Sequence, residues 1–141
     1  YKDKNDLFEQ MIWRDVKFIF TPTCSLEQWR IRVAEFCTRL KEDRVVHYKL
    51  ARNNETAFKN FYTNVLYELF LKRAYRLRDK EQFTMTRQLH RRFLYMSGGA
   101  ATVIYEWIMS GCPDSPEDFA DLLANMIGEN GSVDELRSYS N

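Results

Sequence analysis

The two histidines are the side chains best suited to bind a metal ion or move a proton, and neither lies in a pattern that does so. His47 and His90 belong to no HExxH motif, and neither has an acidic residue three positions before it. The Glu-x-x-His motif that builds di-iron centres in helical bundles is therefore missing. We expect no metal site, and we expect both histidines to be surface or hydrogen-bonded structural residues.

Serine and cysteine nucleophiles are no better supported. Ser97 precedes two glycines, but it lacks both the GxSxG spacing and a strand before it, and the glycine pair lacks the spacing of a phosphate-binding loop. Cys112 follows the end of a predicted helix, where the dipole would raise the pKa of the thiol. We therefore expect no catalytic site and no cofactor, and predict that the chain is not an enzyme.

Composition indicates a folded domain in a reducing compartment. The chain has 141 residues, 45% of them hydrophobic and 15% aromatic, which is enough to bury a core and argues against disorder. The net charge of +1 gives no general reason to expect nucleic-acid or membrane binding. Three cysteines form no CxxC pair and leave one unpaired in any disulfide scheme. With no signal peptide or membrane span visible, we expect a cytoplasmic protein.

Aromatic side chains are abundant, and such residues are most often ordinary core. Buried tyrosine and tryptophan nevertheless need partners for their polar atoms, so a helical bundle that holds several of them can enclose a small apolar or aromatic ligand. The candidates are those whose tips could turn inward between the first, second and fourth predicted helices. They are Trp13, Phe36, Tyr62, Tyr67 and Tyr95.

The helix that must organise these residues is predicted from Phe83 to Gly111. From Phe93 to Tyr105 it carries no ionisable group except two tyrosines, so we expect every side of it to be covered by protein. This uncharged segment is too short to cross a bilayer, which takes about 20 apolar residues. Gly98 and Gly99 lie in its middle, where each costs about 1 kcal/mol relative to alanine. We interpret the pair as a close helix crossing, with a second subunit as one candidate for the other helix.

A second helix follows after a tight corner. Gly111 suits a left-handed helix end, Pro113 cannot continue a helix, and Ser115 can cap a helix from Pro116 to about Gly128. The two helices should form an antiparallel hairpin with apolar faces that meet a second copy of the chain. The expected interface residues are Ala101, Tyr105, Ile108, Phe119, Leu122, Leu123 and Met126.

The remaining chain also reads as helical. Apolar spacing predicts helices after Asp3 and after Ser25, and a particularly regular one from Glu55 to about Arg78. Val45 to Arg52 is either a separate short helix or a continuation. We find no strand-like alternation, and predict an all-α antiparallel bundle of about six helices in residues 1–130, followed by a polar tail at 131–141.

Two stretches resemble the tetracycline-repressor (TetR) family. Residues 1–8, YKDKNDLF, look like the junction between that family's DNA-binding head and its effector domain. The second stretch is similar to the family's last two helices, and it consists of residues 93–99 through 106–111 followed by 115–119. The resemblance implies a homodimeric transcriptional regulator, usually a repressor, in which the last two helices of each subunit form a four-helix bundle and a ligand lodges among the middle helices.

This sequence departs from the family in one respect, because no helix-turn-helix precedes Tyr1. We therefore expect the DNA-binding head to belong to residues before Tyr1, and expect this piece alone not to bind operator DNA. Two other interpretations stay open at this stage. One is a free-standing helical adaptor that binds a protein partner through the hairpin face, and the other, which the missing ligands disfavour, is an enzyme built on a helical bundle.

Overall fold

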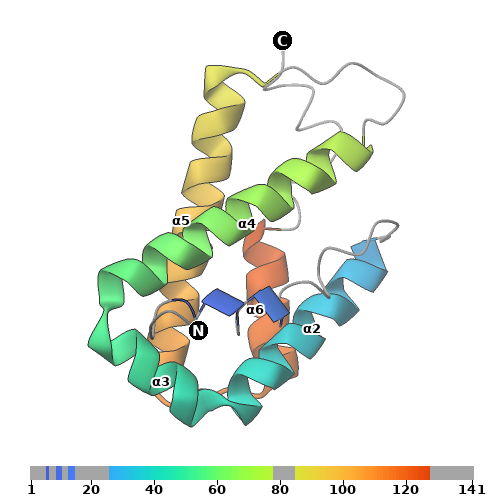
Figure 1. The fold of residues 1–141 in the computed structure, drawn as a ribbon. Helices are drawn as coiled ribbons and strands as arrows, with labels where there is room; N and C mark the ends of the chain where they lie inside the picture. Colours follow the sequence, from blue (N-terminus) through green and yellow to red (C-terminus); the bar gives the residue numbers. More distant parts are fainter. Residues whose placement is uncertain (1–5, 7–8, 11–12, 15–25, 78–84, 128–141) are drawn as a thin grey trace.

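A computed structural model describes residues 6, 9–10, 13–14, 26–77 and 85–127, and every regular element within them is a helix (Figure 1). The predicted all-α class is confirmed. The helices whose first and last residues are described are α2 (Leu26–Glu42), α3 (Arg44–Asn53), α4 (Glu55–Leu77), α5 (Arg87–Met109) and α6 (Pro116–Ile127). Five residues of the expected first helix are described and are helical, whereas the rest of it and the predicted tail lie outside the described residues.

Local capping signals explain where the later helices start and stop. The Ser115 hydroxyl accepts a hydrogen bond from the Asp118 N–H at 3.1 Å, and Gly111 has a φ of 86°, as predicted for the corner. The long helix begins later than expected, at Arg87 rather than Phe83. The reason is that Thr86 acts as its N-cap and accepts a hydrogen bond from the Leu89 N–H at 3.1 Å.

The segment that the sequence left undecided is a separate short helix. α2 ends at Glu42, and α3 begins at Arg44 after Asp43, which makes no side-chain capping bond. α3 then ends at Asn53, and the side chain of Asn54 accepts a hydrogen bond from the Ala57 N–H at 3.0 Å at the start of α4. These breaks let the chain turn around the base of the bundle between α2 and α4 (Figure 1).

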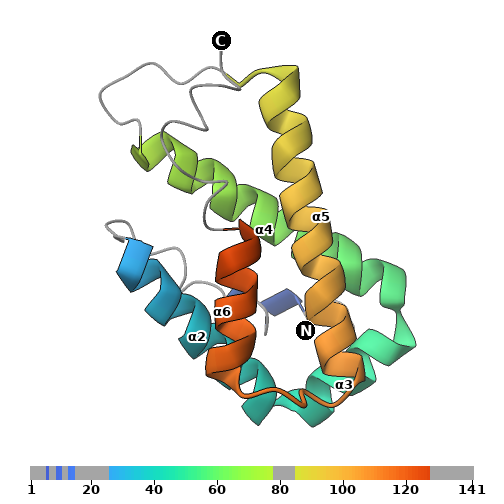
Figure 2. The same cartoon turned by 180° about the vertical axis from the view of Figure 1, so that it is seen from behind.

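The bundle is built from two packed pairs of helices. α4 crosses α5 in front of it, while α6 lies beside α2 (Figure 1). α5 and α6 run antiparallel, as predicted, but α6 packs mainly on α2 rather than on α5. They touch near the corner, where the Trp107 and Phe119 rings stack with centroids 4.1 Å apart. Seen from behind, α5 and α6 lie next to each other on one face of the molecule (Figure 2).

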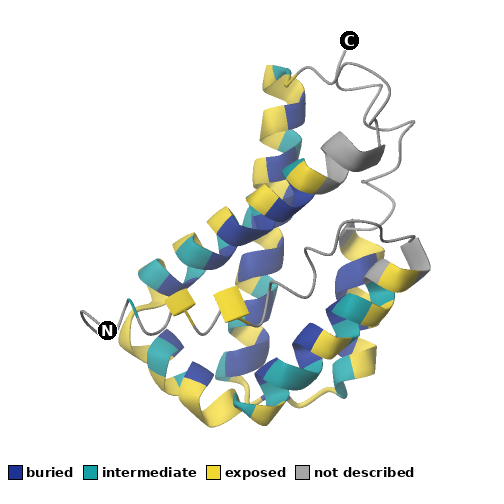
Figure 3. Ribbon diagram, turned by 45° about the vertical axis from the view of Figure 1, so that its right-hand side comes forward, coloured by how far each residue is buried: buried dark blue, intermediate teal, exposed yellow. Residues whose placement is uncertain are grey.

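The core lies where the inward faces of all five helices meet (Figure 3). Its largest fully buried side chains are Trp107, Tyr62, Phe36, Phe58, Phe93, Leu40, Leu89, Ile104, Ile108 and His47. The opposite side of each helix is exposed, including the rear side of α5. Within a single chain only one face of α5 is covered, so the expectation that protein covers its other sides stays a prediction.

Candidate functional site

Two of the five predicted pocket residues lie together in the interior. Phe36 of α2 and Tyr62 of α4 are fully buried, with ring centroids 6.3 Å apart. Phe58, one helical turn before Tyr62, adds a third ring at 4.8 Å from Tyr62. These rings form a cluster, named here the aromatic cluster, that joins α2 to α4. The three rings are apolar apart from the Tyr62 hydroxyl, so a molecule that entered the cluster would have to be largely apolar or aromatic.

The other three predicted pocket residues lie away from this cluster. The Tyr67 hydroxyl, in the middle of α4, is 2.6 Å from Nδ1 of His90 on α5. Trp13 is 43% exposed, and its ring meets the edge of Phe61 at a centroid distance of 6.4 Å. Tyr95 is 75% exposed, with the Arg92 guanidinium 5.8 Å from its ring centroid. In this conformation the structure therefore does not bring Trp13, Tyr67 and Tyr95 into one pocket with Phe36.

His47 and Trp107 are buried residues with polar ring nitrogens, and sequence reasoning singled out neither as a site residue. His47 on α3 is fully buried, not at the surface, and shares the inward side of its helix with Ala51 four positions later. Trp107 is buried on α5, and its indole Nε1 has no hydrogen-bond partner within the described part of the chain. The i, i+4 spacing of His47 and Ala51 was a usable signal, although it is weak in so short a helix.

Cys37 and Cys112 are buried near the corner, and neither thiol is reactive. Burial is the main cause that raises the pKa of the Cys37 thiol to about 12, and the neighbouring Cys112 and Glu117 raise it further. The pKa of Cys112 is also raised, as predicted, but burial is the cause rather than the end of the helix. Both thiols are free and stay protonated at neutral pH, so neither is a thiolate nucleophile or ligand.

The rear face of α5 is an apolar surface that the described residues leave uncovered. Leu94 and Tyr95 are exposed, and a Cβ atom added to Gly98 or Gly99 would meet no atom within 4 Å. Thr102 continues this side of the helix. We call these five residues the outer face of α5. A surface of this kind in an otherwise packed domain is typical of a site for a protein partner.

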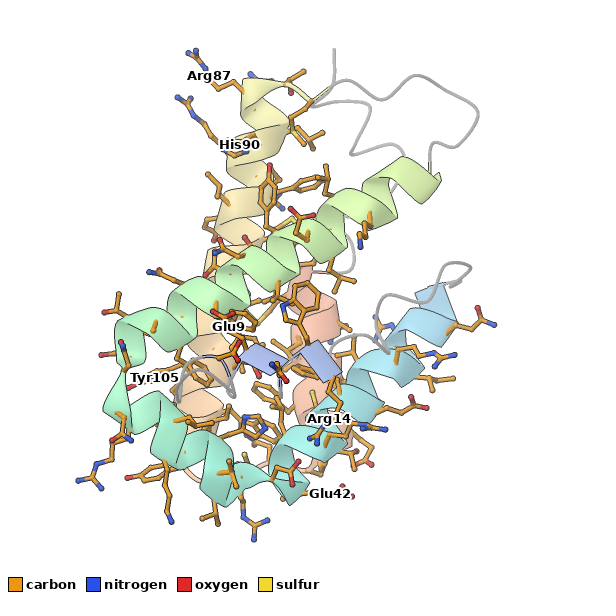
Figure 4. The ribbon with its side chains drawn as sticks, viewed as in Figure 1. Glu9, Arg14, Glu42, Arg87, His90 and Tyr105 are labelled. Atoms are coloured by element: carbon orange, nitrogen blue, oxygen red, sulfur yellow. The ribbon has the colours of Figure 1, made fainter. Side chains whose placement is uncertain are left out.

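The predicted interface residues divide between the interior and the surface. Leu122 and Met126 of α6 are 48% and 43% exposed, and α6 lies next to α5 on the face seen in Figure 2. Four others are buried within the chain and cannot touch a second copy in this conformation: Ala101, Ile108, Phe119 and Leu123. Tyr105 is partly buried, packed against Phe58 at 5.6 Å and beneath the Lys59 ammonium at 4.8 Å (Figure 4).

Comparison with known proteins assigns the helical domain to a family. A family model described as the C-terminal region of transcriptional regulators, of the TetR type, matches residues 27–129. The chain belongs to the TetR family. No curated protein and no solved structure matches it. The matched region is the part of a TetR-type regulator that is associated with ligand binding and dimerisation, and domains of this type are typically not enzymes.

The structure of this TetR-type domain fits that assignment. In the described residues, no cluster of His, Cys, Asp and Glu side chains could hold a metal ion. No described helix combines the length and apolar character needed to pass through a membrane. What the described part of the domain does offer is a buried aromatic cluster and an uncovered apolar face on its last two helices.

Proposed function

We propose that this domain dimerises and senses a ligand for a DNA-binding transcriptional repressor in the cytoplasm. We place the domain in residues 1–130, and operator binding in a helix-turn-helix head of the same regulator. The observation that carries the proposal is the uncovered apolar outer face of α5, together with the exposed side chains of Leu122 and Met126 on α6. Two identical faces of this kind can bury each other about a two-fold axis, as a homodimer requires.

Sensing is proposed to act through the aromatic cluster. Phe36 on α2 and Tyr62 on α4 belong to helices that pack against α6 and α5, respectively. A ligand that separates these two rings would therefore shift the two pairs of helices relative to each other. It would change operator binding only to the extent that it binds one arrangement better than the other, and a tenfold preference corresponds to about 1.4 kcal/mol.

Ligand binding can be tested by a thermal-shift screen with planar aromatic and lipophilic compounds. A compound at about 100 times its dissociation constant adds about 2.7 kcal/mol of stability, which is readily detected as a rise in Tm. The rise should be smaller in Phe36→Leu, which changes the cluster, and unchanged in the matched control Tyr95→Phe, whose ring is exposed. An equal rise in both variants would show that the compound binds elsewhere, and no rise with any compound would contradict the sensing role.

Dimerisation and repression are tested separately. Sedimentation equilibrium should give twice the chain mass of 16.9 kDa at micromolar concentration. In the regulator with its DNA-binding head, a stabilising compound should also lower operator affinity, measured by fluorescence anisotropy of a labelled duplex. A compound that stabilises the domain but leaves operator affinity unchanged would contradict the repressor mechanism while leaving ligand binding intact.

A further inference from the structure

The glycine pair on the outer face of α5 has no packing function within the described chain. Gly98 and Gly99 are both helical, and a Cβ atom at either one would meet nothing within 4 Å. Alanine would therefore fit at both positions and would favour the helix more than glycine does. Glycine in such a place is explained by the close approach of a helix from another molecule.

The residues around the glycines form two rows along the helix. Side chains four positions apart lie above one another on a helix. One row contains Arg91, Tyr95 and Gly99, and the other contains Gly98, Thr102 and Glu106. A two-fold axis through the peptide between Gly98 and Gly99 exchanges these rows. It places the arginine opposite the glutamate, the large tyrosine opposite the small threonine, and glycine opposite glycine.

We propose that two copies of α5 cross antiparallel at Gly98–Gly99, so that Arg91 of each copy pairs with Glu106 of the other. The proposal rests on the dimer proposed above and specifies its register. Fifteen positions separate the two residues, or about 22 Å along the helix, so each ion pair lies about 11 Å from the axis. If the helix axes cross at about 20°, the two helices are still close together at that distance from the two-fold axis. The long side chains of Arg91 and Glu106 can then reach each other.

Charge favours this arrangement over two others. A parallel pair of α5 helices would set Arg91 opposite Arg91 and Glu106 opposite Glu106. In the other alternative, the two-fold axis runs along the helices and α5 faces α6 of the second copy. Glu106 would then lie at the same height as the acidic first turn of α6, which contains Glu117 and Asp118. Like charges that face each other oppose association. The antiparallel α5 crossing is the arrangement of these three that matches opposite charges.

Both charged side chains are available for this contact. Arg91 and Glu106 are exposed, and neither has an ion-pair partner among the described residues. Met126 also fits the arrangement, because the C-terminal end of α6 lies level with the middle of α5 (Figure 2). Its exposed side chain would then flank the crossing. Arg87, one turn before Arg91 and likewise exposed, would lie opposite Ser110 rather than Glu106 about this axis and provides a matched control (Figure 4).

The test is a charge exchange measured by sedimentation equilibrium of the whole chain. Arg91→Glu and Glu106→Arg should each raise the dimer Kd at least tenfold, because each creates two like-charged pairs. The double variant, which carries both changes, should return to within threefold of the unchanged chain. Arg87→Glu should change Kd by less than threefold. The difference between single and double variants should shrink in about 0.5 M salt, where exposed charges are screened. Circular dichroism verifies that every variant remains helical.

The outcomes separate the register from the dimer itself. A double variant that dimerises no better than the weaker single variant overturns the antiparallel register, while a dimeric unchanged chain leaves the proposed function standing. An effect of Arg87→Glu as large as that of Arg91→Glu also overturns the register, because it shows a general charge effect. An unchanged chain that sediments as a monomer overturns both proposals.

Discussion

The inner and outer faces of α5 differ in how they are packed. The inner face, with Phe93, Ile104 and Trp107, is buried against α4 and the corner with α6. The outer face presents Leu94, Tyr95 and two glycines to solvent. The comparison teaches that an apolar helix can have two separate tasks. One face holds the domain together, and the other is proposed to contact a second copy of the chain.

Removal of the largest inner side chain should have the largest effect. Trp107→Ala removes the ring that stacks on Phe119 and leaves a cavity between α5 and α6. We expect the free energy of unfolding to fall by about 3–5 kcal/mol, measured by urea denaturation. Trp107→Phe keeps an aromatic ring and should lose much less. A loss below 1 kcal/mol for Trp107→Ala would show that the inner face is not the structural face.

The two faces should respond differently to the same added side chain. Ala101→Leu overpacks the fully buried inner face and should lower the unfolding free energy by about 1–3 kcal/mol. Gly98→Leu enters open space, so in dilute monomeric samples it should cause no loss, and a gain of up to about 1 kcal/mol from helix propensity is expected. Urea denaturation at submicromolar concentration makes the comparison. Equal losses in the two variants would remove the distinction between the faces.

The stability of the domain at alkaline pH tests whether water is excluded from the interior next to the inner face of α5. Burial raises the folded-state pKa of Cys37 from an ordinary value of 9.0 to about 12, so the folded chain holds a proton that the unfolded chain releases. Its contribution to stability is complete below pH 9 and is lost as the pH rises from about 9 to 12, by at most about 1.4 kcal/mol per pH unit. Urea midpoints should therefore fall more steeply with pH than in Cys37→Ala. Parallel slopes would mean that water reaches the thiol.

Single contacts on the exposed side of the bundle should contribute least. Arg30 of α2 donates a hydrogen bond to the Asn125 side chain at 3.2 Å and lies 3.9 Å from the Asp121 carboxylate of α6. These groups are largely exposed, so Arg30→Ala should cost about 0.2–1 kcal/mol in urea denaturation. Arg52→Ala, at an exposed site on α3, is the control. A loss above 2 kcal/mol for Arg30→Ala would show that surface polar contacts, and not the core, hold α6 on α2.

Features determined by neighbouring residues could be predicted from the sequence. The corner is an example, because the left-handed Gly111 and the Ser115 cap depend on a few adjacent positions. The separate α3 could not be decided, because Asp43 makes no capping bond that would mark its start. The later start of α5 depends on Thr86, a cap whose use is decided by competition among nearby residues.

Features that depend on which elements pack together were less accessible. Phe36 and Tyr62 were expected to meet and do, whereas Tyr95 has the same chemical character and points to solvent. Spacing shows that Ala101 and Ile108 share a side of α5, but it cannot tell whether that side faces the chain itself or a partner. The packing of α6 on α2 decides which side of α5 faces the chain itself. That packing brings together residues nearly 100 positions apart, as in the Arg30–Asn125 contact.

The most direct test of the account is the mass of the unchanged chain and of Gly98→Leu by sedimentation equilibrium at micromolar concentration. The account predicts twice 16.9 kDa for the unchanged chain and a shift to 16.9 kDa for the variant, which keeps its helical content. A monomeric unchanged chain, or a variant that remains fully dimeric, would contradict the claim that the outer face of α5 is covered by a second copy.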